Sequence, residues 1–188
     1  MKKIIIFASG NGSNAENIVL KIKELSDFSV AAIFTNNPRA KVIERAHQLD
    51  IICHVFTKNQ LNSGLVSQLI AFEKPDLIVL AGFLWKVPES LTAAYPNQII
   101  NIHPALLPKY GGKGMYGHHV HEAVLANGEK ETGITIHYVN EHYDEGQIIF
   151  QKSVDISPCQ TADEIATKVQ DLEYEYFPKV VLELLNKL

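Results

Sequence analysis

Short runs of apolar residues alternate with segments of helical periodicity along the chain. Residues 3–8 (KIIIFA) are almost entirely apolar, which is typical of a strand whose sheet is covered on both faces. In residues 13–25 the apolar side chains recur every three or four positions, which indicates a helix with one buried face. The patterns predict strands at 3–8, 29–35, 51–56, 76–81, 98–102, 133–139 and 147–154. They predict helices at 13–25, 40–49, 61–72, 88–94 and 120–126, and one from Thr161 toward Leu188.

This alternation predicts an α/β fold with a doubly wound, mostly parallel sheet, because parallel neighbours need a crossover connection. A short turn separates the last two predicted strands, so we expect them to pair antiparallel at the sheet edge in the C-terminal half. A capping box beginning at Thr161 opens the last helix, in which Pro178 marks a kink or a break. The chain has no internal repeat or low-complexity linker, so we expect a single domain over residues 1–188.

Composition and charge narrow the class of protein. Hydrophobic residues make up 46% and charged residues 20%, as in ordinary globular proteins. A net charge of −4 with scattered Lys and Arg argues against a nucleic-acid partner. The apolar run near the N-terminus is too short for a secretion signal, and no stretch could span a membrane. Cys53 and Cys159 are isolated and are interpreted as reduced packing residues of a cytoplasmic protein.

A glycine-rich turn, SGNGSN at 9–14, follows the first predicted strand. Glycines permit a sharp turn, and exposed N–H groups at a helix N-terminus attract phosphate. Ligands of open α/β sheets also gather at the carboxyl ends of the strands. Neither GxGxxG nor GxxxxGK[ST] is present, which disfavours a dinucleotide or a nucleoside triphosphate. Two alternatives remain: a phosphate-binding loop, or an ordinary tight turn in which Ser13 caps the helix.

Asn101 and His103 stand at the end of the predicted strand 98–102, and a long irregular loop follows. Side chains two residues apart in a strand share one face, so we expect the amide and the imidazole to point together. An imidazole can donate or accept a proton near neutral pH, and an amide can donate to a developing oxyanion. Asp144, in the turn NEHYDEG, would raise the pKa of His103 and favour its charged form if it lies beside the ring. A solvated turn aspartate is the alternative.

Two further stretches attract attention. His118, His119 and His121 form an HHxH pattern, but no HExxH or recognised ligand spacing accompanies them, so we expect no metal. The segment LAGFLWKV at 80–87 places large apolar groups directly after a buried strand. Such groups are either core or a slot for a flat heterocycle.

Four segments occur in an order that resembles the folate-dependent phosphoribosylglycinamide formyltransferase family over nearly the whole chain. They are SGNGSN (9–14), LAGF (80–83), NIHPALLPKY (101–110) and HYVNEHYDEGQII (137–149). The resemblance implies a Rossmann-like formyltransferase fold without a metal. It also implies transfer of a formyl group from 10-formyltetrahydrofolate to the amine of 5-phosphoribosylglycinamide in purine biosynthesis.

The same resemblance implies roles for individual residues. Asn101 and His103 would stabilise a tetrahedral intermediate, with Asp144 tuning His103. Ribonucleotide contacts would come from Gly10, Asn11, Gly12, Ser13, Asn14, Gln170 and Glu173. Folate contacts would come from Phe83, Leu84, Trp85, Lys86, Val87, Asn140 and Glu141. Residues 1–100 would thus form a ribonucleotide phosphate-binding half, and residues 101–188 a catalytic and folate-binding half.

The chain departs from the family pattern at several places. Trp85 stands where some members carry Arg, GGKGMYG lengthens the loop after LLPKY, and Lys58 and Lys86 are the candidates for the folate glutamate tail. The alternatives are a formyltetrahydrofolate hydrolase, a transferase acting on initiator tRNA, which would need a basic surface, and a non-catalytic ligand-binding protein. We expect small-molecule substrates, no membrane partner, and a monomer or weak homodimer.

Overall fold

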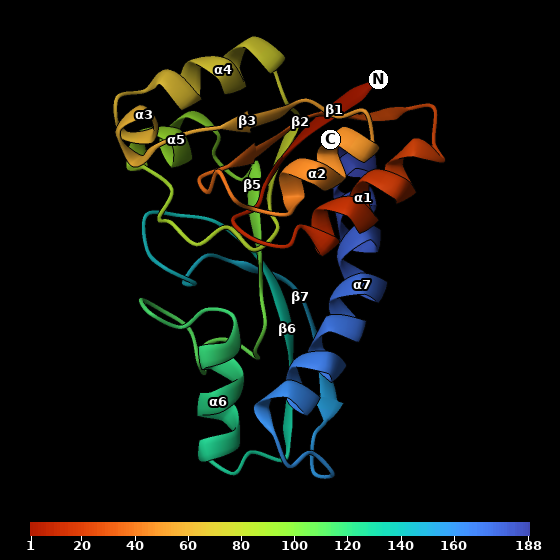
Figure 1. Ribbon diagram of the computed structural model, residues 1–188, viewed down its shortest axis with the longest axis vertical. Coiled ribbons are helices and arrows are strands. Elements are labelled where there is room, and N and C mark those ends of the chain that lie inside the picture. The colour runs from red at the N-terminus through yellow and green to blue at the C-terminus, as the bar shows by residue number, and fades with distance from the viewer.

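The computed structural model describes all 188 residues, which fold around one seven-stranded sheet (Figure 1). The strand order is β3-β2-β1-β4-β5-β6-β7. The pairs among the first five strands in this order are parallel, whereas β6 and β7 are antiparallel to their neighbours. The predicted sheet with its antiparallel edge is confirmed. The strands are β1 (Lys2–Phe7), β2 (Phe28–Thr35), β3 (Cys53–Val55), β4 (Leu77–Leu80), β5 (Ile99–His103), β6 (Glu131–Tyr138) and β7 (Ile148–Asp155).

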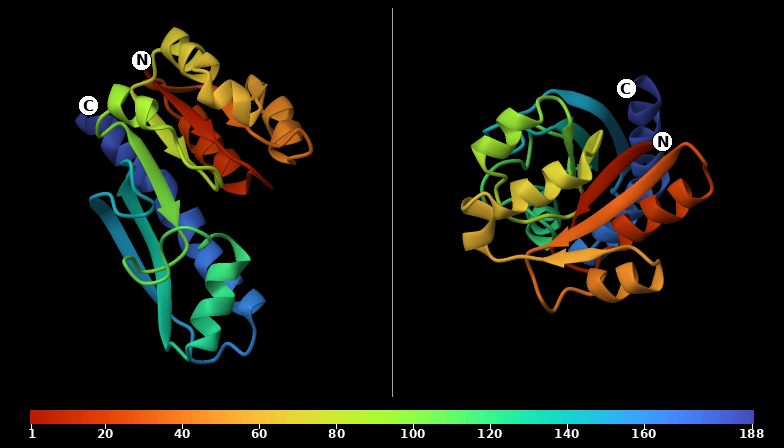
Figure 2. Two further views of the ribbon diagram at one scale, coloured as in Figure 1. Left: turned by 90° about the vertical axis from the view of Figure 1, so that its left-hand side faces the viewer. Right: turned by 90° about the horizontal axis from the view of Figure 1, so that it is seen from above.

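Helices cover both faces of the sheet, as Figure 2 shows from two directions. In β1, Ile4 and Ile6 pack into one hydrophobic core, and Ile5 and Phe7 pack into the other. The larger core contains side chains from α1, α2, α6 and α7, and the smaller one contains side chains from α3, α4 and α5. This double burial explains why the strand is apolar at every position. The helices are α1 (Ser13–Lys23), α2 (Val42–Gln48), α3 (Lys58–Asn62), α4 (Leu65–Glu73), α5 (Glu89–Ala94), α6 (His118–Ala126) and α7 (Ala162–Lys187).

The helix predicted at 61–72 is wrong in its extent, because the structure has two helices there. Thr57 and Gln60 form a capping box that starts α3 earlier than the apolar period suggests. Gly64, at φ +86°, then breaks the chain direction before α4 begins.

The second difference concerns Pro178, which lies inside α7 without ending it. A proline in a helix lacks the N–H that would bond to the carbonyl four residues earlier. Here the side-chain amide of Asn17 donates to that carbonyl, of Tyr174, at 2.8 Å. A contact from α1 therefore satisfies the group that the proline leaves free.

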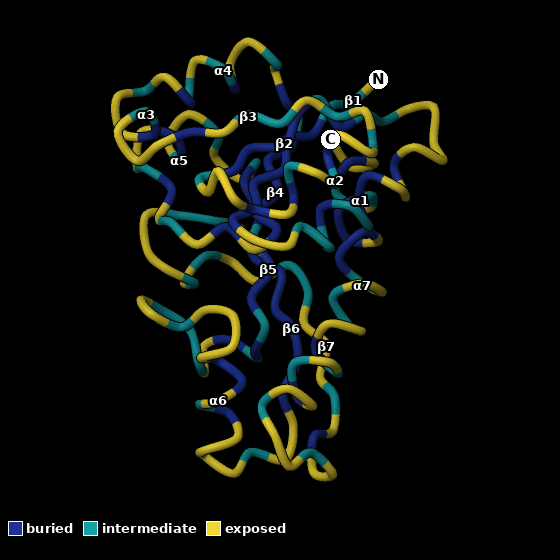
Figure 3. Tube along the Cα trace, in the orientation of Figure 1, coloured by how far each residue is buried: buried dark blue, intermediate teal, exposed yellow.

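The central strands are the most deeply buried part of the molecule, as Figure 3 shows for β5 and β6. Both chain ends lie at the same end of the molecule (Figure 1), where the Lys2 ammonium donates to the Leu185 carbonyl at 2.6 Å. The carboxyl ends of β1, β4 and β5 point toward the middle of the molecule, where the loop after β6 also arrives. This arrangement gathers four loops that are far apart in the sequence.

Candidate active site

A cavity of about 890 Å³ opens where these loops meet. Its lining comes from both halves of the chain and includes most of the residues predicted from the sequence. Those on the lining are Gly10, Asn14, Phe83, Leu84, Trp85, Lys86, Val87, Asn101, His103, Asn140, Asp144, Gln170 and Glu173. Asn11, Gly12, Ser13 and Glu141 do not line it, and neither does Lys58.

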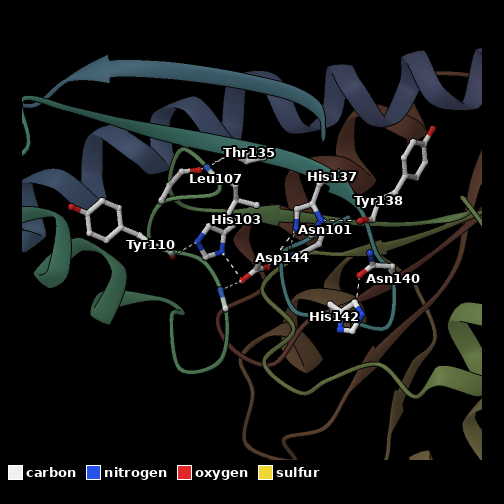
Figure 4. A network of polar contacts seen from close by, with 12 residues as sticks. Asn101, His103, Leu107, Tyr110, Thr135, His137, Tyr138, Asn140, His142 and Asp144 are labelled. Atoms are coloured by element: carbon white, nitrogen blue, oxygen red, sulfur yellow. Dashed lines mark hydrogen bonds and ion pairs between the residues drawn. The ribbon is translucent and has the colours of Figure 1, made fainter. Parts of the chain in front are cut away.

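Asp144 is the centre of a polar network on one wall of the cavity (Figure 4). Its Oδ2 lies 3.6 Å from Nδ1 of His103 and accepts a hydrogen bond from the N–H of Gly112 at 2.9 Å. Its Oδ1 lies 3.5 Å from Nε2 of His137. The same Nε2 lies 3.2 Å from Nδ2 of Asn101. The structure therefore brings Asn101, His103 and Asp144 together and adds His137 between them.

The proton positions on the two imidazoles follow from their main-chain partners. Nε2 of His103 lies 2.7 Å from the carbonyl oxygen of Tyr110, and a carbonyl only accepts, so Nε2 carries the proton. Nδ1 of His137 lies 2.9 Å from the carbonyl of Tyr138 and carries the proton for the same reason. In the neutral ring, Nε2 of His137 then accepts from the Asn101 amide. Only one of the two N–H bonds of that amide is used in this way, and the other can donate to a ligand.

Sequence reasoning missed His137. It pairs directly with Asn101 across β5 and β6, but nothing local to either strand sets this register. One signal was available: Thr135 and His137 alternate with the buried Ile134 and Ile136 although every one of these positions is buried. Thr135 accepts from the Leu107 N–H at 3.0 Å and so fixes the loop after β5, whereas His137 reaches Asn101 and Asp144.

Burial dominates the ionisation of His103, whose side chain is 4% exposed. Burial lowers the pKa of His103 below 6.5, and the nearby Asp144 charge opposes this shift without cancelling it. Burial would raise the pKa of Asp144, but donation from Nε2 of His137 when that ring is charged, the charge of His103 and the Gly112 N–H hold that pKa below its usual value. The Asp144 charge therefore raises the pKa of His103 as expected, but in the free protein desolvation outweighs the ion pair and the pKa lies below its ordinary value.

The glycine-rich turn ends in a helix whose N-terminus has no side-chain cap. Gly12 is the N-cap residue at φ +75°, and Ser13 is the first residue of α1, so the ordinary Ser13 cap is not formed. The turn is held from outside by Arg45, which donates to the main-chain and side-chain oxygens of Asn11 at 2.9 and 3.2 Å. Arg45 also pairs with Glu16. The first N–H groups of α1 are left available for an anion.

Asn14 and Glu173 meet across α1 and α7 at the same end of the cavity. Nδ2 of Asn14 donates to the Glu173 carboxylate at 2.7 Å, and the buried Oδ1 of Asn14 has no partner. Burial raises the pKa of Glu173 to about 7, although the bond from Asn14 acts in the opposite direction. Gln170, one helical turn earlier on α7, also lines this end.

The segment after β4 forms an apolar wall whose side chains alternate between core and cavity. Phe83 and Val87 are buried in the smaller core, whereas Leu84 is 48% exposed. The Trp85 ring packs edge-on against Phe56 at 6.2 Å between centroids. Ser9, a second residue that sequence reasoning missed, fixes this wall to the glycine-rich turn because its hydroxyl accepts from the Leu84 N–H at 2.9 Å.

The three clustered histidines do not act together. His118 and His119 are exposed and each lies near Glu122, whereas His121 is buried and its Nδ1 has no partner. No group of three or more His, Cys, Asp or Glu side chains is arranged to hold a metal ion. None of the helices combines the length and the apolar character needed to cross a membrane.

Comparisons with known proteins agree with this fold. The formyl transferase family matches residues 2–181. The chain is 40% identical over 193 residues to the phosphoribosylglycinamide formyltransferase of Bacillus subtilis (strain 168), covering 99% of this chain and 96% of the relative. Its identity to the Escherichia coli (strain K12) enzyme of that name is 33% over 186 residues, covering 95% and 84%. The crystal structure of phosphoribosylglycinamide formyltransferase from Bacillus halodurans matches with a TM-score of 0.89 at 36% identity, covering 99% of this chain and 96% of that one. The chain therefore belongs to the formyl transferase family, as an enzyme of its phosphoribosylglycinamide formyltransferase group.

Proposed function

We propose that this protein transfers the formyl group of 10-formyltetrahydrofolate to the amine of 5-phosphoribosylglycinamide in purine biosynthesis. The observation that carries the proposal is the meeting of Asn101, His103 and Asp144 on one wall of a cavity that reaches α1. An amide donor, an imidazole and a carboxylate on one wall of a cavity are groups suited to acyl transfer to an amine.

The two substrates would occupy opposite ends of the cavity. The ribonucleotide phosphate would bind N–H groups of the turn from Gly10 to Asn14, whose two end residues line the cavity, and Gln170 and Glu173 would contact the rest of that substrate. The folate ring would lie against the apolar wall of residues 83–87 and the loop containing Asn140 and Glu141. Residues 1–100 would supply the phosphate site, and residues 101–188 would supply the catalytic groups. Two segments depart from this division, because residues 83–87 would contact folate and α7 would contact the ribonucleotide.

Asn101 and His103 would do the chemistry at the formyl carbon. The free N–H of the Asn101 amide would donate to the oxygen that becomes negative when the amine attacks. Neutral His103 has its lone pair on Nδ1, so it can accept the proton that the attacking amine loses. The resulting imidazolium lies 3.6 Å from Asp144 and can return the proton to the departing folate nitrogen. One proton is thus taken up and given back, and the enzyme ends the cycle unchanged.

Two effects would share the rate enhancement. An oxyanion donor of this kind is worth about 2.7–4 kcal/mol. Holding two substrates in contact adds up to about 7–11 kcal/mol in well-oriented reactions. Holding two substrates in contact requires a cavity large enough for both, and this cavity is lined by residues from both halves of the chain.

The test is a formyl-transfer assay with both substrates and purified protein. We expect formylated ribonucleotide to accumulate, and we expect His103→Asn to slow its formation by about 10²- to 10³-fold, while His47→Asn, at an exposed position of α2 outside the cavity, leaves the rate unchanged. Formate release at the same rate without ribonucleotide would instead identify a hydrolase. Calorimetric binding of ribonucleotide without turnover would identify a non-catalytic binding protein.

A further inference from the structure

His103 is enclosed by the loop that follows β5, and three bonds fix that loop. The N–H of Leu107 donates to Thr135 at 3.0 Å, and the N–H of Gly112 donates to Asp144 at 2.9 Å. Between them, the carbonyl of Tyr110 accepts from Nε2 of His103 at 2.7 Å. Tyr110 has φ +58°, a left-handed conformation that non-glycine residues rarely adopt. Something must therefore hold residue 110 in this position.

The side chain of Tyr110 provides such a restraint. It points away from His103 (Figure 4), and its hydroxyl donates to Oε1 of Glu129 at 2.9 Å. The Lys109 ammonium donates to the same oxygen at 2.9 Å. Glu129 follows the C-terminal end of α6, so these contacts, which we call the 110–129 clasp, fasten the loop to a second element. None of its three side chains lines the cavity.

We propose that Tyr110 and Glu129 are positioning residues for His103: the clasp holds the Tyr110 carbonyl against Nε2 and thereby decides which ring nitrogen carries the proton in the neutral imidazole.

The need for such a device follows from the position of Asp144. A carboxylate 3.6 Å from Nδ1 favours a proton on Nδ1, because that N–H can donate to it. If Nδ1 of the neutral ring carried the proton, it would have no lone pair with which to accept a proton from the substrate amine. The Tyr110 carbonyl opposes this tautomer, since it requires a proton on Nε2. The importance of the Nδ1 lone pair for turnover rests on the proposed function, whereas control of the tautomer by the clasp does not.

Tyr110→Phe and Glu129→Ala test the clasp, and nitrogen NMR of the His103 ring provides a readout that is independent of activity. We expect both variants to move the neutral ring toward the Nδ1–H tautomer and to lower the pKa of His103, because a hydrogen bond to the charged form is weakened. The other titratable groups that face His103, which are Asp144, His137 and His121, are unchanged in both variants. We expect kcat to fall about tenfold with both KM values within twofold of the wild type.

Two further variants separate positioning from general structural damage. Glu129→Gln retains an oxygen that accepts from the tyrosine hydroxyl, so it should restore both the tautomer and kcat. The double variant Tyr110→Phe/Glu129→Ala should be no worse than Glu129→Ala alone, because Glu129→Ala already removes the bond that Tyr110→Phe removes. Tyr176→Phe is the matched control, since its hydroxyl makes no hydrogen bond and the residue lies outside the cavity.

The outcomes are distinguishable. Unchanged nitrogen shifts and an unchanged His103 pKa in folded Tyr110→Phe would overturn the clasp, whatever the behaviour of Glu129→Ala. If the wild-type protein transfers no formyl group but the variants still show the tautomer shift, the clasp is supported and the proposed function is overturned.

Discussion

At the scale of single residues, Asp144 serves two imidazoles at once and depends on its neighbours to do so. It adopts φ +57°, a left-handed conformation that Asp tolerates better than most residues. Gly146 follows two positions later, and any side chain there would overlap the main-chain carbonyl of Tyr138. The D-x-G spacing is therefore a backbone requirement of the turn that aims the carboxylate at His103 and His137.

Removing either His103 or Asp144 should abolish most of the activity without unfolding the protein. We expect His103→Asn and Asp144→Asn each to lower kcat by about 10²- to 10³-fold, because proton transfer and charge stabilisation are lost. Asn is close to both side chains in size and tolerates the left-handed turn at position 144. Steady-state kinetics and thermal melting measure the two quantities separately. Near-full activity in both variants would contradict the mechanism.

His137 should matter less, and only through the groups it orients. We expect His137→Ala to lower kcat about tenfold, because the Asn101 amide loses the ring nitrogen that orients it. If His137 acts through Asn101, the double variant with Asn101→Ala should cost no more than Asn101→Ala alone. Strictly multiplicative losses in kcat would show instead that the two side chains act independently.

At the scale of elements, the strands and most helices were predictable because each carries its own period of apolar residues. The capping box at Thr161 was predictable for the same reason, since its signal is local. The interruption at Gly64 could not be predicted, because it depends on a positive φ. The continuity of α7 through Pro178 could not be predicted either, because it depends on a side chain from α1. The Asn101–His137 pair was missed because strand register is a long-range property.

The turn before α1 leaves no room for a side chain at Gly12. A Cβ at Gly12 would lie 2.9 Å from Cα of Val42, at a φ of +75° that disfavours any side chain. Gly12→Ala must therefore move the turn and the N–H groups at the start of α1. We expect KM for the ribonucleotide to rise at least tenfold while KM for the folate stays within twofold, as measured by two-substrate kinetics. Equal loss of both affinities would indicate a folding defect rather than a damaged phosphate site.

At the scale of the molecule, α7 joins the two halves of the chain. It packs against α1 and α6 and contributes Gln170 and Glu173 to the end of the cavity formed by the glycine-rich turn. The bond between Asn14 and Glu173 crosses 159 positions of sequence, so closing this end of the cavity requires the complete fold. Sequence patterns predicted one domain, but they could not show that a titratable group would be half-buried at this junction.

The half-buried Glu173 carboxyl predicts a specific dependence of stability on pH. The pKa of Glu173 is raised to about 7 from an ordinary 4.5, so between these values the folded state binds more protons than the unfolded chain. The contribution of Glu173 to the unfolding free energy is therefore complete below pH 4.5 and is lost as the pH rises toward 7, with a slope of at most about 1.4 kcal/mol per pH unit.

Glu173→Gln should remove this contribution, because the amide fills the same space and does not titrate. His103 and His121 have lowered pKa values and act in the opposite direction, since they cost stability as the pH falls below 6.5. The informative quantity is therefore the difference between the variant and the wild type in denaturant titrations at several pH values, in which both histidine contributions cancel. We expect the variant to gain stability relative to the wild type as the pH rises from 4.5 to 7. A constant difference across this range would mean that Glu173 ionises in the folded protein as it does in the unfolded chain.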